Sequence, residues 1–234
     1  MTAPEKQAAE FLTGMKLRLR NPGFSQPGLD LFQTARFHRG LPWFSPGELN
    51  AAERDHWYRL LARYTRLQRE LTRVLQAFQQ HGIGCLPFKG PVWKQHLAPE
   101  QPFRQCTDLD AFVPRHQIEQ AFAVLRDRGY HNFYGLSAAQ LQALVPHVHS
   151  MEFRDAQNGF VFDLHWDLTE GYCRPPFSDR HLNQLTDLSL SGIKTGFIDS
   201  VVLFMILMHG AKNHYEKFIY IIDLFNWQSR HPEW

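Results

Sequence analysis

Hydrophobic residues recur every three or four positions over a long stretch that begins after Ser45-Pro46-Gly47-Glu48 and ends at Gly82. This spacing predicts a helix with one buried face. Ser45 is a typical N-cap, Pro46 suits the first helical position, and Glu48 suits a capping box. We therefore expect a long helix directly after Ser45. Its inward-facing residues are Trp57, Leu60, Leu61, Tyr64, Leu67, Leu71, Val74, Leu75 and Phe78.

Short apolar segments then alternate with helical patterns. The segment GIGCLPFKG predicts a strand that ends at Lys89, and Gly90-Pro91 predicts a short helix that runs to His96. The next strand ends near Val113, and a helix follows from Pro114. Its inner stripe is Ile118, Ala121, Phe122 and Leu125. The order strand, helix, strand, helix predicts a sheet with helices packed on it.

A β-hairpin is expected around Asn158-Gly159, because this dipeptide is flanked by alternating apolar residues. The residues that should face the core are Phe162, Leu164, Trp166 and Leu168, and those on the other face are Asp163, His165 and Asp167. A two-residue turn would place Arg154 opposite Asp163 and Glu152 opposite His165. A longer loop would shift this register.

Three regions are expected along the chain. Residues 1–45 form an irregular, Pro- and Gly-rich wrapping segment with a short helix in residues 1–20. Residues 46–170 form the core, preceded by the long helix, and Ser137 with Gln140 marks a further capped helix within it. Residues 171–234 form a helical subdomain, in which two apolar helices follow Asp199.

Composition narrows the class of protein. The chain has 234 residues, 44% of them hydrophobic, which suffices for a real core. A formal charge of +2 does not by itself indicate a nucleic-acid or membrane partner. The apolar run VVLFMILM is too short to span a membrane, and three distant Cys residues without CxxC pairing favour reduced thiols. A cytoplasmic protein without a membrane partner is therefore expected.

Acidic residues interrupt the second expected strand, FRQCTDLDAFV. Asp108 and Asp110 are two positions apart, so they should share one face of the strand. Two carboxylates this close repel each other, so they need compensation by water or a cation. Lys89-Gly90 at a strand-to-helix junction, Arg104 and Asp163 complete a set that suits phosphoryl transfer.

The chemistry assigns a role to each of these residues. Asp108 and Asp110 would bind two Mg²⁺ ions, and Asp163 would bind the catalytic metal and act as base. Lys89 and the backbone of Gly90 would hold the triphosphate at the start of the following helix, and Arg104 would bind a phosphate of the nucleotide.

The motifs LPFKGPVWKQHL, FRQCTDLDAFV, FDLHWDL and LMHGAKNHYEKFIYIIDL resemble the uncharacterised nucleotidyltransferase group of the DNA polymerase beta-like superfamily. The resemblance covers roughly residues 50 to 227. It implies an α/β (α+β) fold with a small mixed sheet flanked by helices, and helical N- and C-terminal regions. It also implies Mg²⁺ or Mn²⁺ as cofactor and an NTP, with ATP favoured, as substrate. One departure is Lys89-Gly90, where most of the superfamily has Gly-Ser.

Each candidate residue also has a structural interpretation. The acids of the strand could form a solvated edge, Asp163 could pair with Arg154, and Arg104 could be a structural partner of the aspartates. His165 shares a face with Asp163 and could contact substrate or be structural. Two further candidates in HGAKNHYEK, which could bind phosphate or base or end a polar helix, are Lys212 and Asn213.

Two other patterns are less informative. A zinc site of His147, His149 and His165 is disfavoured, because alternation along the strands should place His149 on the face opposite His165. An arginine-rich stripe on the long helix could bind RNA, but its acids and glutamines favour a solvated face. The stripe consists of Arg59, Arg63, Arg66, Arg69 and Arg73.

The expected function is therefore transfer of an NMP from a metal-bound NTP to an acceptor. The acceptor could be a small molecule, a peptide or protein hydroxyl, or a tRNA end, of which nucleic acid is not favoured. The rival hypotheses are a catalytically silent binding module of the same fold and a metal-dependent phosphohydrolase. The sequence leaves the acceptor and the oligomeric state open.

Overall fold

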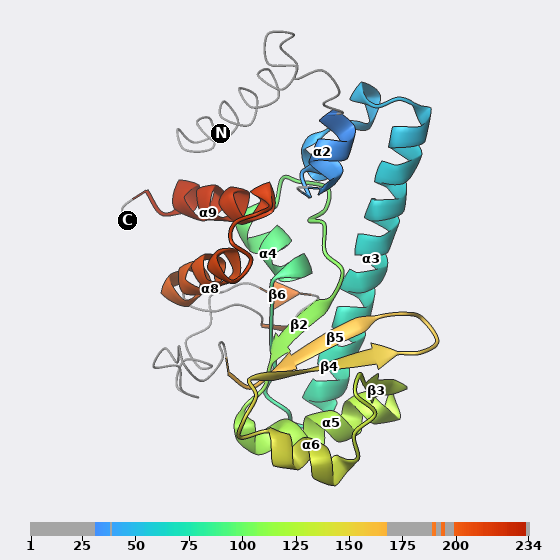
Figure 1. Ribbon diagram of the computed structural model, residues 1–234, viewed down its shortest axis with the longest axis vertical. Helices are drawn as coiled ribbons and strands as arrows, with labels where there is room; N and C mark the ends of the chain where they lie inside the picture. Colours follow the sequence, from blue (N-terminus) through green and yellow to red (C-terminus); the bar gives the residue numbers. More distant parts are fainter. Residues whose placement is uncertain (1–30, 38, 168–188, 191–192, 195–198, 233–234) are drawn as a thin grey trace. The chain divides into compact units, whose positions relative to one another are not determined.

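The computed structural model describes residues 31–37, 39–167, 189–190, 193–194 and 199–232 (Figure 1). The helix expected within residues 1–20, Leu168 and Cys173 lie outside the described residues. The chain divides into two compact units. The first contains the described residues up to Leu60, Leu97–Gln105 and those from Ser200 onward; the second contains Leu61–His96 and the described part of Cys106–Asp199. In the described ranges, none of the helices has the length and apolar character needed to cross a membrane.

A five-stranded mixed sheet forms the centre of the second unit. Its strands are β1 (Leu86–Phe88), β2 (Leu109–Phe112), β3 (Tyr130–Asn132), β4 (Ser150–Asp155) and β5 (Val161–His165). They lie in the order β1-β2-β5-β4-β3, and β2 and β5 are parallel while the other neighbours are antiparallel. The predicted α/β (α+β) class with a small mixed sheet is therefore confirmed. Strand β3 was not predicted, because its three residues are too few to show an alternation.

The long helix α3 (Ala51–Gln80) carries the predicted apolar stripe, with Leu71 and Phe78 fully buried. Its start differs from the prediction. The Ser45 and Glu48 capping box is present, but it closes a 3-10 turn, η2 (Pro46–Glu48). A second reciprocal pair, Asn50 with Glu53, then caps α3 through backbone hydrogen bonds of 2.9 and 3.0 Å. The helix therefore begins about one turn later than expected.

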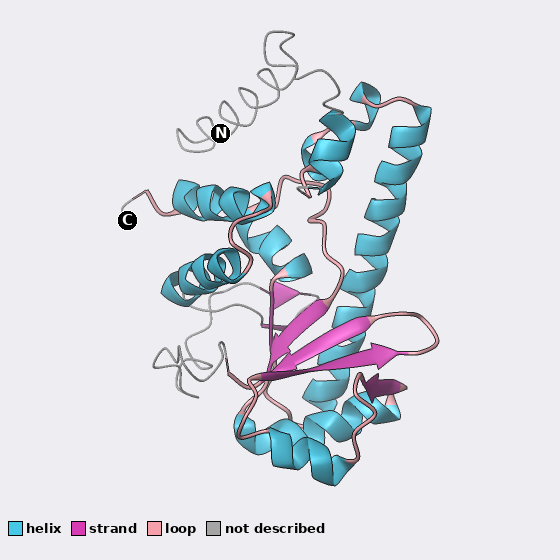
Figure 2. Ribbon diagram, in the orientation of Figure 1, coloured by secondary structure: helices cyan, strands magenta, loops and turns pink. Residues whose placement is uncertain are grey.

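The helices that accompany the sheet are α4 (Gly90–Leu97), α5 (Ile118–Asp127), preceded by the 3-10 turn η3 (Arg115–Gln117), and α6 (Ala138–Leu144) (Figure 2). The predicted capping box of Ser137 and Gln140 begins α6. A two-stranded sheet, β6 (Ser189–Leu190) with β7 (Ile193–Lys194), was not predicted.

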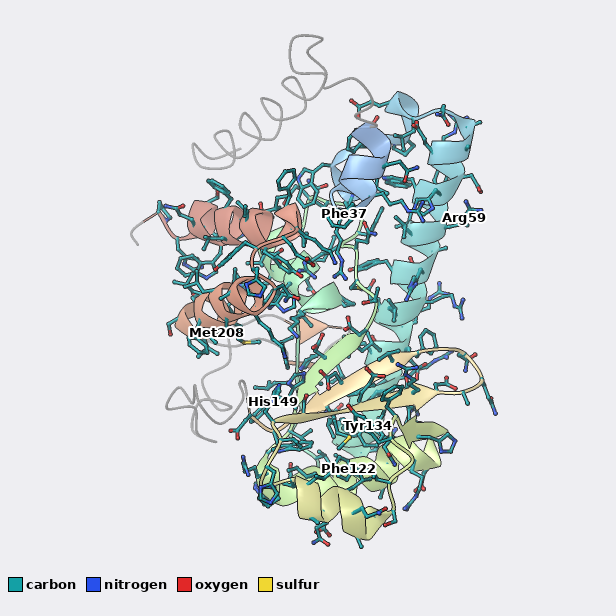
Figure 3. The ribbon with its side chains drawn as sticks, in the orientation of Figure 1. Phe37, Arg59, Phe122, Tyr134, His149 and Met208 are labelled. Carbon is teal, nitrogen blue, oxygen red and sulfur yellow. The ribbon has the colours of Figure 1, made fainter. Side chains whose placement is uncertain are left out.

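One face of the sheet forms the hydrophobic core. Phe153 of β4 and Phe162 of β5 are register partners, so their side chains lie on the same face. Phe78 of α3 contacts the Phe162 ring with centroids 6.3 Å apart, and Phe122 of α5, labelled in Figure 3, contacts Phe153 at 5.2 Å. Leu164 is fully buried, as predicted. Because α3 and α5 cover this face, the alternate residues of β2 and β5 must point to the opposite one.

The hairpin between β4 and β5 has a longer loop than the two-residue turn, residues 156–160. The carboxylate of Asp155 accepts hydrogen bonds from the backbone N–H of Gln157 and from both the backbone and the side-chain N–H of Asn158. These bonds stabilise a wider turn. The register is therefore shifted, and Glu152, not Arg154, lies opposite Asp163.

The first unit contains α2 (Leu31–Phe37), η1 (Leu41–Trp43), α8 (Asp199–Lys212, from Ser200) and α9 (Phe218–Arg230). The two apolar C-terminal helices match the prediction, whereas α2 falls in a segment predicted to be irregular. Trp57 fixes this unit locally, because its indole N–H donates to the Leu41 carbonyl at 3.1 Å and its ring meets Phe103 edge-on.

Candidate active site

Asp110 and Asp163 lie side by side on the face of the sheet opposite the core. They are register partners on the adjacent parallel strands β2 and β5. Asp110 is 4% exposed, whereas the side chain of Asp163 is 29% exposed and reaches solvent. The predicted approach of Asp163 to the acidic strand is therefore present. It follows from the sheet order, in which β5 pairs directly with β2 although residues 113–160 lie between the two strands along the chain.

Lys89 forms an ion pair with Asp110, with Nζ 2.6 Å from the carboxylate oxygen Oδ1. The lysine directly follows Phe88, which is the register partner of Asp110 on β1. Lys89 has φ of +58° and Gly90 has φ of +38°. Left-handed backbone costs energy for a residue with a side chain, so the turn from β1 into α4 holds Lys89 in a strained conformation.

Gly90 begins α4 close to the segment that precedes β2. A Cβ at this position would lie 3.6 Å from the Cys106 sulfur and 3.7 Å from the Asp108 carbonyl oxygen. These are ordinary van der Waals distances, so the positive φ is the stronger reason for glycine here.

His165 contacts both carboxylates from the end of β5. Its Nε2 lies 3.3 Å from Asp110 Oδ1 and 3.0 Å from Asp163 Oδ2. The ring is 5% exposed and meets the Phe88 ring edge-on, with centroids 4.9 Å apart. Its Nδ1 is buried and has no hydrogen-bond partner among the described residues. The predicted shared face of Asp163 and His165 is therefore confirmed.

These contacts shift the titration of all four groups. Burial alone would raise the pKa of Asp110, but the Lys89 charge and the His165 hydrogen bond hold this pKa far below its usual range. Burial likewise opposes the charge of Asp163, yet His165 lowers its pKa. In His165 and Lys89, burial is outweighed by the neighbouring carboxylates, which raise both pKa values. The contacts therefore favour the ionised forms of Asp110 and Asp163 and the protonated forms of Lys89 and His165.

The side chains of Asp110, Asp163 and His165 could hold a metal ion, because one ligand atom from each lies within 4.8 Å of the others. This group differs from the predicted set of three acids, since His165 takes the place of Asp108. Asp108 precedes β2 and is half-buried, and it accepts a hydrogen bond from the Thr107 hydroxyl at 3.3 Å. Its charge contributes to the raised pKa of Lys89. The role predicted for Asp108 stays a prediction.

Three other predicted residues belong to the first unit. Arg104 forms a buried bidentate ion pair with Asp223 of α9, at 3.1 and 2.6 Å. A structural partner was an alternative for Arg104, but the expected partners were the strand aspartates. The signal for Asp223 was a lone acid within the apolar stretch FIYIIDLF. Lys212 ends α8, and Asn213 donates its side-chain N–H to the His209 carbonyl at 2.7 Å.

The parity argument for His149 was wrong. Its ring lies 5.8 Å from that of His165, although alternation had placed the two on opposite faces. His149, labelled in Figure 3, precedes β4, and its carbonyl accepts hydrogen bonds from the backbone N–H of both Trp166 and Asp167. Regular alternation therefore does not extend to this residue.

A pocket of about 570 Å³ lies at the other edge of the sheet, between α5, β3 and α6. Its lining includes the rings of Phe122, Tyr130 and Phe153 and the Glu119 carboxylate, which accepts a hydrogen bond from Gln142. Its lining residues do not include Asp110, Asp163 or His165, so this pocket is separate from the candidate active site.

Comparison with known proteins gives one informative match. A search of curated proteins finds none that matches. Among solved structures, the crystal structure of ANT(2")-Ia in complex with adenylyl-2"-tobramycin is similar, with 8% sequence identity and a TM-score of 0.45. The alignment covers 71% of this chain and 98% of that one. A family described as uncharacterised nucleotidyltransferase matches residues 40–233. Since this match spans most of the sequence, the chain belongs to the family of uncharacterised nucleotidyltransferases.

Proposed function

We propose that the protein transfers a nucleotidyl group from a metal-bound NTP to a hydroxyl or phosphate of an acceptor. The observation that carries this proposal is the pairing of Asp110 with Asp163 on adjacent parallel strands. Neighbouring carboxylates need positive charge beside them, which Lys89 and His165 provide and which a divalent cation would also provide, and family membership makes a nucleotide the expected substrate.

The residues present fit a divalent metal. Asp110 and Asp163 would bind it, with His165 or Asp108 as the further ligand. When bound, such an ion would neutralise charge on the phosphates and lower the pKa of an attacking hydroxyl. Carboxylate oxygens suit Mg²⁺ and Mn²⁺, and a histidine nitrogen in the set favours Mn²⁺ relative to an all-oxygen site.

Lys89 neutralises Asp110 through the contact of Nζ with Oδ1 at 2.6 Å. Lys89 would turn from Asp110 to a phosphate where a divalent cation neutralises the carboxylates, because its side chain is 21% exposed and its Nζ is held by one short contact. The backbone N–H groups at the start of α4 would bind phosphate oxygens directly after Lys89, at the positive end of the helix dipole.

Asp163 is the better candidate for the proton acceptor. It is more exposed than Asp110, and its lowered pKa keeps it ionised at neutral pH. His165 would position this carboxylate through the contact between Nε2 and Oδ2 at 3.0 Å. A direct contact between His165 and substrate is less favoured, because the ring is buried.

The nucleotide contacts predicted for Arg104, Lys212 and Asn213 are retained as proposals. Arg104 already has a full bidentate partner in Asp223, so a phosphate would compete with that carboxylate. Of these residues, Lys212 at the end of α8 is the better candidate for a phosphate contact.

Calorimetric titration tests the proposal. Each of the four NTPs is titrated into the protein with Mg²⁺, with Mn²⁺ and with EDTA, and Asp163→Asn is titrated in parallel. We expect affinity for an NTP that depends on the metal and falls in the variant. Equal affinity with and without metal, or no NTP binding, would contradict the proposal and favour the silent module. Release of phosphate in place of pyrophosphate would identify a phosphohydrolase.

A further inference from the structure

A group of arginines lies on the exposed side of α3, in the same unit as the sheet. Arg66, Arg69 and Arg73 are all exposed. Together with Asn158 and Phe160 from the β4–β5 loop, they line a surface pocket of about 180 Å³. The sequence alone favoured a solvated face for these arginines. The loop residues are the new observation, because they turn one side of a helix into a concave site.

The pocket carries uncompensated positive charge. Among the described residues, neither Arg66 nor Arg69 forms an ion pair with an acid. Arg73 reaches Glu70 at 3.6 Å, but that carboxylate is 8% exposed and also lies 3.6 Å from Arg128. One buried acid therefore serves two arginines, and the three guanidinium groups at the pocket face solvent with a net positive charge.

Phe160 gives the pocket an aromatic wall. The Cζ of Arg66 lies 5.5 Å from the centroid of the half-buried Phe160 ring, within the range of a cation–π contact. Such a contact restrains a guanidinium without using its N–H donors. Arg66 therefore keeps its hydrogen-bonding capacity for a ligand.

The spacing of the arginines indicates which anion fits. Residues three and four apart on a helix lie about 4.5 and 6 Å apart along its axis and on one face. The three arginines therefore lie in a row along one face of α3. A row of bidentate donors beside an aromatic ring suits consecutive phosphates of a single nucleic-acid strand better than one isolated phosphate.

We propose that this pocket, defined by Arg66, Arg69, Arg73, Asn158 and Phe160, binds the phosphodiester backbone of a single-stranded nucleic-acid segment, for which RNA is the probe. A membrane surface is a poorer match, because the pocket is concave and its one apolar ring is half-buried. The binding site stands on these residues alone. Its interpretation as a docking site for an RNA acceptor rests on the proposed nucleotidyl transfer.

The test uses fluorescence anisotropy of a labelled single-stranded RNA of about 20 nucleotides, titrated with the full chain at several salt concentrations. Three phosphate contacts predict that the logarithm of affinity falls with the logarithm of salt with a slope of about −2. The double variant R66Q/R69Q should weaken binding by about tenfold or more and reduce the slope by about 1.4. Arg73 is left in place because it contacts Glu70.

The matched control is R54Q/R126Q, which removes the same charge at two exposed arginines outside the pocket. It should bind RNA like the unmodified protein. Equal weakening in both double variants would show non-specific charge attraction and overturn the proposal, as would the absence of RNA binding. Binding to phosphatidylserine vesicles, or to pyrophosphate with the same affinity as to RNA, would also overturn it.

Two further titrations separate this inference from the proposed function. R66Q/R69Q should keep its metal-dependent NTP affinity, and Asp110→Asn should keep its RNA affinity. If the unmodified protein binds NTP with metal but does not bind RNA, only the inference about the arginine pocket is overturned. If it binds RNA but no NTP, only the proposed nucleotidyl transfer is overturned.

Discussion

Asp110→Asn removes one carboxylate charge without changing the shape of the side chain. Asp110 is 4% exposed and accepts from Lys89 Nζ at 2.6 Å and from His165 Nε2 at 3.3 Å. Removing one member of a buried ion pair costs about 3–5 kcal/mol. The cost here should be lower, at about 2–3 kcal/mol, because the partly exposed Lys89 regains water and Asn keeps an acceptor oxygen.

This cost leaves the protein folded, since domains are typically stable by about 5–15 kcal/mol. For a chain of this size it corresponds to a fall in Tm of about 5–10 °C. The assay is urea unfolding in EDTA, followed by tryptophan fluorescence and circular dichroism. The double variant Asp110→Asn/Lys89→Met should lose less stability than the sum of the losses in the two single variants, because the second change removes the unpaired cation.

The control is Asp127→Asn, an exposed acid near Arg126 that should change stability by less than about 0.5 kcal/mol. An Asp110→Asn effect no larger than this control would refute the reasoning. So would additivity of the Asp110 and Lys89 changes within about 0.5 kcal/mol, because it would mean that the two residues are not coupled.

Three further predictions concern other parts of the molecule. Arg104→Met should cost about 3–5 kcal/mol in urea unfolding by leaving Asp223 buried and unpaired, and Arg104→Met/Asp223→Leu should recover part of it. Asp155→Ala should lower the free energy of unfolding by about 1–3 kcal/mol at about pH 7. Burial raises the pKa of Asp155, but its hydrogen bonds lower this pKa more, so the difference in stability between the variant and the unmodified protein should shrink as pH falls through the folded pKa. Urea unfolding of both proteins at about pH 3 would check this. Gly90→Ala should cost about 1–2 kcal/mol because of its φ of +38°, and calorimetry should show weaker NTP binding.

Much of the fold was predictable because it depends on local periodicity. The stripe from Trp57 to Phe78 specified the long helix, and the alternation around Phe162 specified which face of β5 is buried. The features that were predicted wrongly depend on competition between local contacts. Ser45 closed a 3-10 turn because Asn50 provided a second cap, and Asp155 widened the hairpin loop although Asn158-Gly159 favoured a tight turn.

The candidate site was predictable in its residue types but not in its pairing. Alternation placed Asp163 and His165 on one face, and the resemblance to nucleotidyltransferases linked them to the acidic strand. That His165 contacts both Asp110 and Asp163 depends on the parallel register of β2 and β5, which no local pattern encodes. The same holds for Arg104 and Asp223, which are 119 residues apart in the chain.

The pairing of Asp110 and Asp163 is the central claim, and the fate of labelled phosphates tests its chemical meaning most directly. The protein is incubated with cell extract, Mg²⁺ or Mn²⁺, and each NTP labelled in parallel at the α- or the γ-phosphate. The account predicts transfer of the α label to an acceptor, release of the γ label as pyrophosphate, and loss of both in Asp110→Asn and Asp163→Asn. Transfer that persists in both variants, or release of the γ label as free phosphate, would contradict it.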